Sequence, residues 1–110
     1  MLTLTLHKNG KKEVYEREDA NLIEMEGFFK LQQDLIDAAN KNELTRVKSA
    51  QMQIEFIASL FKENGVSVDD IRKGWKAKEF DDNCISLFKE ISPEDFEETE
   101  PEEDEKKEKK

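Results

Sequence analysis

The architecture of this protein is set by residues 21–65, NLIEMEGFFKLQQDLIDAANKNELTRVKSAQMQIEFIASLFKENG. Between Leu22 and Ala39, apolar residues recur at steps of three and four with no proline, which predicts a helix of about 18 to 20 residues. The residues of this apolar face are Leu22, Met25, Phe28, Phe29, Leu31, Leu35, Ile36 and Ala39. Asn21 followed three residues later by Glu24 is typical of a capped helix start. We therefore expect a long amphipathic helix that begins just after Asn21.

A second helix is predicted after the polar break at residues 40–42. It should end before Asn64-Gly65, a pair that suits a left-handed helix stop. Because the connection is short, the two helices should lie antiparallel. The apolar residues that keep the helical period are Leu44, Val47, Ala50, Ile54, Ile57, Ala58 and Phe61.

Near the start of the chain, leucine and threonine alternate, which predicts a strand with one leucine face half-buried. Asn9-Gly10 follows, and this pair tolerates the two positive φ angles of a type I′ hairpin turn. If these are the two loop residues, Leu4 faces Tyr15 and Leu6 faces Glu13. A two-stranded ribbon is marginal alone, so we expect it to pack on the helices or on another subunit.

The rest of the chain predicts two more helices and a tail. Ser67 is a helix cap, the helix after it should be short because Gly74 weakens it, and residues 80–91 have the helical period again. The predicted fold class is therefore mainly α (α+β). We expect an N-terminal β-hairpin packed on a small bundle of about four helices, forming one domain over residues 1–92. Residues 93–110 should be a charged, disordered acidic C-terminal tail. At its start Ser92-Pro93-Glu94-Asp95 repeats the helix-start pattern, and residues 97–110 lack the apolar area that offsets the ordering entropy.

The charge of the chain is concentrated in the predicted tail. The net charge is −9, and residues 93–110 hold ten acidic residues and four lysines, against 17 acidic and 14 basic residues in residues 1–92. An acidic body with a more acidic tail argues against nucleic acid as a partner, because such binding depends on Lys and Arg neutralising phosphates. The basic end, Lys106 to Lys110, could reach an acidic partner or fold back on the acids.

The sequence offers little material for catalysis or for a cofactor. His7, the only histidine, should be solvated beside the turn, and Cys84 should be a small buried hydrophobe. The pairs Asp69-Asp70 and Asp81-Asp82 suit helix starts better than a metal site. The isolated glycines form no phosphate-binding loop. We expect no catalytic, cofactor or metal site and no enzyme activity.

The sequence shows no pattern typical of a signal peptide or of a membrane-spanning helix. The first residues lack the apolar run of a signal peptide, and no window approaches the roughly 20 apolar residues of a membrane span. The single cysteine excludes an intrachain disulfide and fits a reducing compartment. We expect a soluble intracellular protein.

Apolar residues cover much of the second predicted helix. Met52, Phe56 and Leu60 lie on a face displaced from its main stripe. These residues could be core under the fourth helix and the hairpin, or they could form a partner groove or a self-association face. We take Met52, Phe56, Leu60 and Trp75 as candidate partner contacts and expect Phe56→Asp to leave helicity nearly intact. The residues expected in the core are Ile54, Ile57 and Phe61.

The segment LFKENGVSVDDIRKGW, residues 60–75, resembles the tail assembly chaperones of long-tailed (siphovirus-type) bacteriophages, the family that includes lambda tail protein G. That family often shows a Leu-Phe helix end, a short turn with Asn, a Ser or Thr cap, then valine, acidic residues, an aliphatic residue and a glycine. The residues in these positions here are Phe61, Asn64, Ser67, Val68, Asp69, Asp70, Ile71 and Gly74.

The resemblance implies a non-enzymatic chaperone that acts in the bacterial host cytoplasm and is absent from the mature virion. Its implied partners are the tape measure protein, which it keeps soluble, and the tail tube protein, whose subunits it helps to recruit. Two other classes stay open. One is a small acidic regulatory or inhibitor protein that binds a basic partner protein, and the other is a structural tail-completion subunit.

Overall fold

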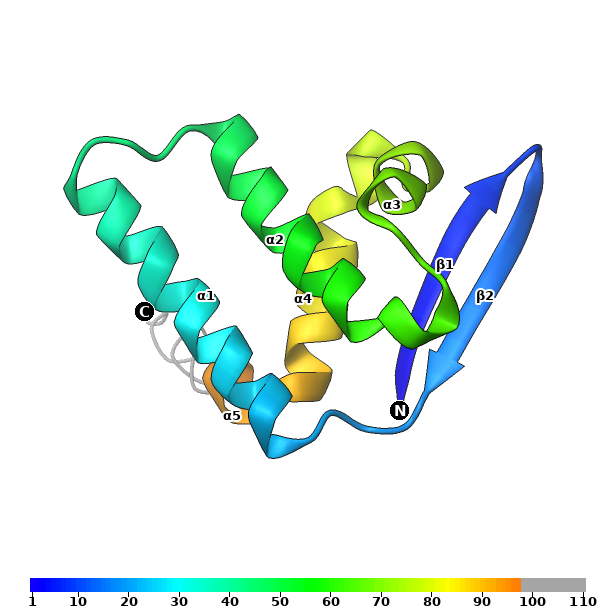
Figure 1. The fold of residues 1–110 in the computed structure, drawn as a ribbon, viewed down its shortest axis with the longest axis horizontal. Coiled ribbons are helices and arrows are strands. Elements are labelled where there is room, and N and C mark those ends of the chain that lie inside the picture. Colours follow the sequence, from blue (N-terminus) through cyan, green and yellow to red (C-terminus); the bar gives the residue numbers. More distant parts are fainter. Residues whose placement is uncertain (98–110) are drawn as a thin grey trace, which may run out of the picture.

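Two strands and five α-helices follow one another in the computed structural model, which describes residues 1–97 (Figure 1). They are β1 (Leu2–Lys8), β2 (Lys11–Arg17), α1 (Leu22–Asn40), α2 (Arg46–Leu60), α3 (Val68–Gly74), α4 (Phe80–Ile91) and α5 (Pro93–Glu97). Short 3-10 helices, η1 (Lys62–Asn64) and η2 (Ala77–Glu79), precede α3 and α4. The predicted fold class, an N-terminal hairpin followed by a helical body, is confirmed.

The predicted tail begins with a short helix, at the helix-start pattern of residues 92–95. Residues 93–97 form the short helix α5, because Pro93 suits the first helical position and Glu94 and Asp95 complement the helix dipole. The disorder predicted for the remainder of the tail falls on residues 98–110, which lie outside the described residues.

The hairpin has the predicted register. Leu4 pairs with Tyr15 and Leu6 with Glu13. Asn9 and Gly10 have φ angles of 51° and 78°, as a type I′ turn requires. The three alternating leucines of β1 are almost completely buried, and β1 packs against α3 and α4. The hairpin thus gains its stability from the helical body, as expected for a ribbon that is marginal alone.

The contact between β1 and α3 depends on a glycine. A Cβ atom at Gly74 would lie 2.9 Å from the Leu6 Cβ and 3.4 Å from the His7 backbone nitrogen. Real Cβ atoms essentially never approach other atoms as closely as the first of these distances. Gly74 therefore lets the end of α3 lie directly on β1, which brings Leu6 into the core.

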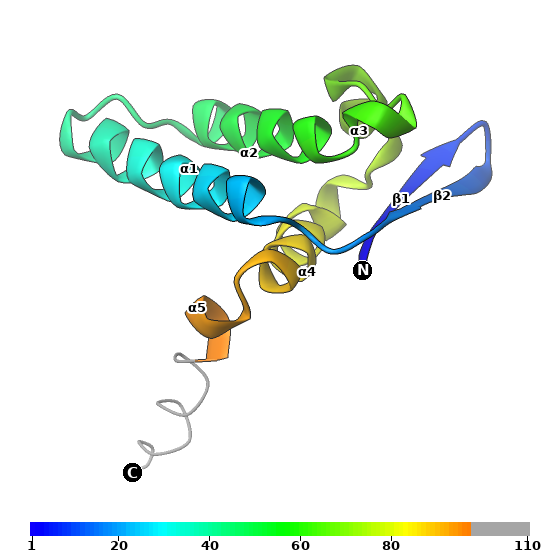
Figure 2. The same cartoon turned by 60° about the horizontal axis from the view of Figure 1, so that its bottom comes forward.

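Helices α1 and α2 form the predicted antiparallel pair, and α4 crosses one face of it (Figures 1 and 2). Asn21 and Glu24 form a capping box at the start of α1, and Thr45 caps α2 through a hydrogen bond to the Lys48 backbone nitrogen. The three helices meet at a cluster of three phenylalanine rings. Phe28 on α1 lies 4.8 Å from Phe88 on α4 and 6.2 Å from Phe56 on α2, measured between ring centroids.

Arg17, at the end of β2, ties the hairpin to both helices of this pair. Its guanidinium donates to the two carboxylate oxygens of Glu24 at 2.6 and 2.8 Å. The same group donates to the Leu60 carbonyl at 2.8 Å, which satisfies a carbonyl in the last turn of α2. These hydrogen bonds from Arg17 hold the pKa of Glu24 below its usual value, against the opposing effect of burial.

The Arg17–Glu24 pair predicts a pH-dependent loss of stability. A carboxyl group whose pKa is lowered by folding contributes stability above its unfolded pKa, near 4.5, and loses this contribution as the pH falls toward the folded pKa. Glu24→Gln keeps the capping acceptor but removes the charge. We expect it to cost about 1 kcal/mol of unfolding free energy at pH 7, and we expect the cost to shrink below pH 4, as measured by urea denaturation.

The matched control is Asp69→Asn, since Asp69 pairs with Arg72 at 3.6 Å on the exposed side of α3. Exposed ion pairs contribute little, so this variant should match the wild type at both pH values. An equal cost of Glu24→Gln at pH 7 and pH 3.5 would show that the Arg17–Glu24 charge pair does not contribute to stability.

Within residues 1–97, no helix combines the length and apolar character needed to cross a membrane.

Candidate partner-binding surface

The four residues predicted to contact a partner do not form an open surface. Met52, Phe56 and Trp75 are half-buried and pack against the core, and Leu60 is only 4% exposed. Leu60 therefore has almost no surface to offer a partner in this arrangement of α2. The role of these four residues in partner binding stays a prediction.

Phe56 in particular is part of the packing between helices. Its ring lies 6.2 Å from both the Phe28 and Phe88 rings, and its Cε1 atom would be 3.2 Å from a Cβ atom at Gly27. A charged residue at position 56 would lose these contacts and bury a carboxylate among aromatic rings. The structure thus changes our expectation for Phe56→Asp from intact helicity to a loss of stability.

Trp75 contributes to a shallow groove between β1 and α4. Its indole meets the Phe80 ring edge-on at 6.1 Å. The groove beside it is lined by Thr3, Leu4, Thr5, Trp75, Asn83, Ser86 and Leu87. This lining mixes polar and apolar side chains and includes none of the other three predicted contact residues.

The residues assigned to the core are confirmed as core. Ile57 and Phe61 are completely buried and Ile54 is nearly so. Cys84 is buried as predicted, and burial, together with the nearby charge of Asp81, raises the pKa of its thiol to about 12. A thiol with this pKa is not a nucleophile at neutral pH.

The polar groups considered for chemistry have structural roles. Asp70 accepts a hydrogen bond from the Ser67 backbone nitrogen at 3.0 Å in a capping box, and this bond lowers its pKa. His7 is half-buried rather than solvated, because α3 lies against its strand. Among the described residues, no group of three or more His, Cys, Asp or Glu side chains could hold a metal ion.

The surface that sequence reasoning missed lies on α1. Leu22, Phe29 and Ile36 are exposed by 70, 43 and 52% respectively, although all three were counted in one apolar face. They belong to a row at steps of three and four residues. We call this row the outer stripe: Leu22, Met25, Phe29, Gln32, Ile36 and Ala39.

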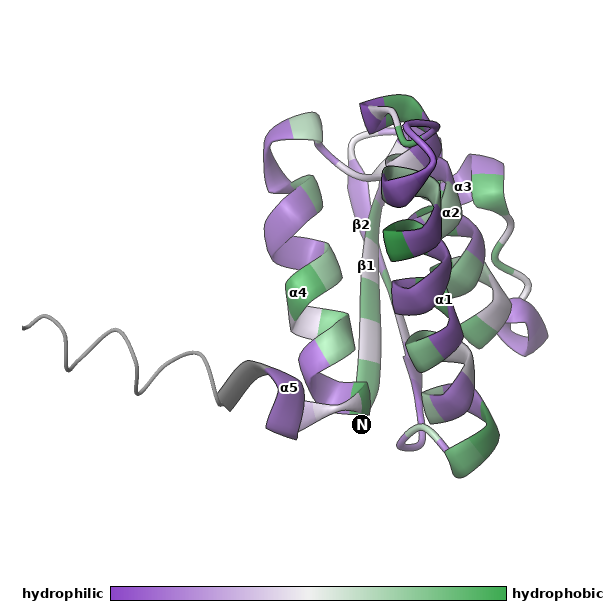
Figure 3. Ribbon diagram, turned by 90° about the vertical axis from the view of Figure 1, so that its left-hand side faces the viewer, coloured by the Kyte–Doolittle hydropathy of each residue, from purple (hydrophilic) through white to green (hydrophobic). Residues whose placement is uncertain are grey.

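A second row at the same spacing faces the core. Its members are Phe28, Leu31, Leu35 and Ala38, all buried or half-buried. Helix α1 therefore has two adjacent rows that contain apolar residues. The body of the protein covers the second row, whereas in the outer stripe only Met25 packs against the core and Leu22, Phe29, Ile36 and Ala39 stay exposed. Figure 3 shows apolar segments interrupting the hydrophilic outside of α1. The signal was available in the sequence, since two interleaved rows are wider than the single apolar face of a surface helix.

Helix α5 forms the other wall of a shallow groove along the outer stripe. Asp95 lines this groove together with Phe29, Gln32, Gln33 and Ile36. α5 lies beneath α1, at the end of α4 (Figure 2). The floor of the groove thus combines the apolar side chains of Phe29 and Ile36 with two glutamine amides, and its α5 rim carries the Asp95 carboxylate.

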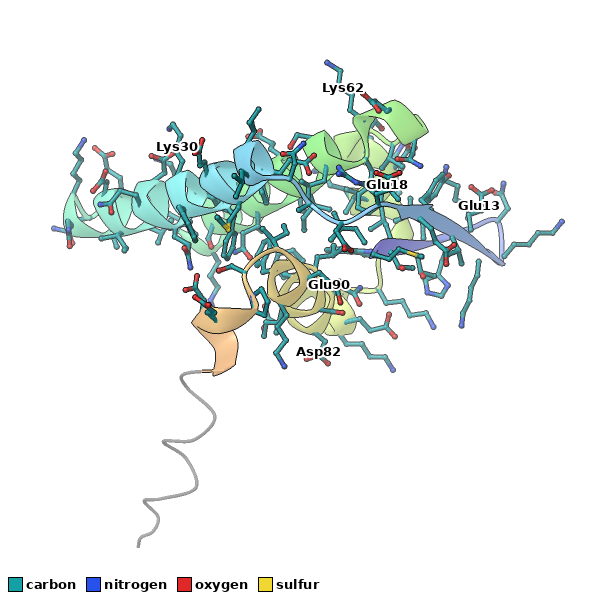
Figure 4. All side chains as sticks on the ribbon, turned by 90° about the horizontal axis from the view of Figure 1, so that it is seen from below. Glu13, Glu18, Lys30, Lys62, Asp82 and Glu90 are labelled. Atoms are coloured by element: carbon teal, nitrogen blue, oxygen red, sulfur yellow. The ribbon has the colours of Figure 1, made fainter. Side chains whose placement is uncertain are left out.

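The two helices that form the groove are strongly acidic. α1 contains four acidic residues and one lysine, and α5 contains three acidic residues and no basic one. The single lysine, Lys30, pairs with Asp34 at 2.9 Å. Figure 4 shows Lys30 on α1 and Asp82 on α4 pointing away from the body of the protein.

A hairpin-and-helix fold with exposed apolar side chains along one helix and a charged exterior is the arrangement expected of a protein-binding module. A family model described as phage tail chaperone protein matches residues 1–110, the entire chain, and the protein belongs to this family. The match confirms the resemblance drawn from residues 60–75. Searches of the curated proteins and of the solved structures returned no match to this chain.

Proposed function

We propose that this protein is a non-enzymatic tail assembly chaperone that binds the tape measure protein, keeps it soluble and helps to recruit tail tube subunits. The observation that carries the proposal is the family match over the whole chain. The tape measure and tail tube proteins are the partners that the resemblance implies. The apolar and charged surface of the protein gives further support.

The surface of the protein suits the task of holding an aggregation-prone helical client. Such a chaperone needs apolar surface that can pair with the client and enough charge to keep the complex dissolved. The outer stripe supplies exposed apolar side chains, and the net charge of −9 supplies the repulsion between complexes. We propose that the protein acts in the host cytoplasm and leaves before the virion is complete.

Co-expression with the tape measure protein of the same phage tests this function. We expect the soluble fraction of the tape measure protein to rise several-fold and the two chains to co-purify. A tape measure protein that stays equally insoluble, with this protein folded and soluble beside it, would contradict the proposal.

Purified virions separate the chaperone from a structural subunit. We expect mass spectrometry to find the tape measure protein in the particles and to find none of this chain. Retention of this chain at a fixed ratio to the tail proteins would favour the tail-completion subunit instead.

A further inference from the structure

We propose that the outer stripe of α1, with α5 as its rim, binds one amphipathic helix of the client, and that this helix carries basic residues beside its apolar row. The inference rests on the proposed function for the identity of the client. It adds the place of binding and the chemical character of the segment that binds.

The spacing of the outer stripe points to a helical occupant. Alternating steps of three and four residues are the spacing by which two helices pack side by side over several turns. The stripe extends from Leu22 to Ala39, nearly the whole length of α1. Its neighbouring row uses the same spacing to pack against α2 and α4, so α1 is built to contact helices on two sides.

The C-terminal segment of the chain itself is a poor occupant. Residues 98–110, ETEPEEDEKKEKK, contain no apolar residue. A segment without apolar side chains cannot replace the water over Leu22, Phe29 and Ile36 with favourable contacts. Residues 98–110 are therefore poorly suited to cover the outer stripe.

A second copy of the protein is disfavoured by charge. Pairing this face with itself would bring two strongly acidic surfaces together, because α1 and α5 carry seven acidic residues and one lysine between them. The lysine is already paired with Asp34. Like charges placed face to face in an interface are repulsive, so self-association through this groove is opposed.

An amphipathic helix with basic flanks would complement both the apolar side chains of the groove and the acidic residues beside them. Its apolar row would cover Phe29 and Ile36, and its Lys or Arg residues would face Asp95 on α5 and the acidic flank of α1. Rim charges act mainly on the association rate and on its salt dependence. The apolar contacts at the centre should carry most of the affinity.

The test uses the full chain with two stripe residues changed, Phe29→Asp and Ile36→Asp together. Both positions are exposed in the free protein, so we expect the variant to fold. The matched control is Val14→Asp, because Val14 is 55% exposed on β2, at the end of the molecule distant from α5 (Figure 1). Circular dichroism and urea denaturation establish that all three proteins are folded.

The binding probe is a synthetic amphipathic helix of about three heptads with leucines at steps of three and four. One version has lysines beside the leucines and the other has glutamates. Fluorescence anisotropy should show that the lysine peptide binds the wild type and Val14→Asp equally, and that the double variant binds at least about tenfold more weakly. The glutamate peptide should bind the wild type more weakly than the lysine peptide does, and equal binding of the two peptides would contradict the proposed basic character of the client helix.

The double variant is also more acidic than the wild type. If charge attraction alone held the lysine peptide, the double variant would therefore bind it more tightly, whereas loss of the apolar contacts predicts weaker binding. Unchanged or tighter binding of the lysine peptide to the double variant would overturn the proposal.

Co-expression of the double variant with the tape measure protein tests the binding site separately from the chaperone function. If the wild type and the double variant both solubilise the client, the chaperone function stands and the binding site is wrong. If the wild type itself fails, the function is wrong.

Discussion

Replacing Phe28 by alanine should remove about 3–5 kcal/mol of unfolding free energy, the cost typical of deleting a buried phenylalanine. Phe28 is 2% exposed, and its ring contacts both Phe88 and Phe56. The substitution would empty the point at which α1, α2 and α4 meet. Urea denaturation followed by circular dichroism measures the loss.

The adjacent residue provides the control for this variant. Phe29 has the same side chain on the same helix, but it lies on the outer stripe and is 43% exposed. Phe29→Ala should cost clearly less than Phe28→Ala, about 1–2 kcal/mol, because nearly half of the surface of Phe29 is already in contact with water. Equal losses of unfolding free energy for the two variants would contradict the structure, in which Phe28 is buried in the core and Phe29 is partly exposed on the outer stripe.

Gly74→Ala should destabilise the protein by about 1–3 kcal/mol, as expected when a methyl group is forced into a filled space. The added Cβ would lie 2.9 Å from the Cβ of Leu6, an atom fixed to the β1 backbone rather than the end of a flexible side chain. Relieving this steric clash would require β1 to move away from α3, and this movement would expose the leucine face of the hairpin. Thermal and urea denaturation should both show the loss.

Gly27→Ala is the matched control, because Gly27 is also helical and also faces a neighbouring element, in this case helix α2. A Cβ atom there would meet only the edge of the Phe56 ring at 3.2 Å, and the ring can shift by a few tenths of an ångström. Alanine also gains about 1 kcal/mol of helix propensity over glycine. We expect this variant to lie within about 1 kcal/mol of the wild type. A larger loss at Gly27 than at Gly74 would contradict the packing described here.

Local signals in the sequence were sufficient to predict the elements of the fold. The Asn9-Gly10 turn fixes the hairpin register, since only two residues can lie in the loop. The caps at Asn21 and Ser67 fix the starts of α1 and α3 through hydrogen bonds within four residues. These features depend on neighbours in the chain, and for this reason they can be recognised without knowledge of the tertiary structure.

The contacts between distant segments could not be predicted in this way. Arg17 donates to the Leu60 carbonyl, 43 positions further along the chain, and nothing in the local pattern of either residue indicates it. The close approach of Gly74 to Leu6 is also a property of the assembled fold. In the sequence alone, Gly74 indicated only a weak helix.

The division between core and surface was the least predictable feature. Val47 was placed in the main apolar stripe of α2, but it is strongly exposed, because it lies in the first turn of α2, next to the connection from α1. Phe28 and Phe29 were indistinguishable as members of one apolar face of α1. Only the positions of α2 and α4 determine which of the two rows on α1 is covered.

Methyl NMR of the isoleucine side chains, with and without the client helix, tests the central claim most directly. Ile36 lies on the outer stripe, Ile85 is exposed on α4 and Ile57 is buried in the core, so each reports on a different region. We predict that the lysine-flanked peptide, and the soluble tape measure complex, shift or broaden the Ile36 signal while Ile85 and Ile57 stay unchanged. An unchanged Ile36 signal together with a shifted Ile85 signal, at peptide concentrations that saturate binding, would contradict the account.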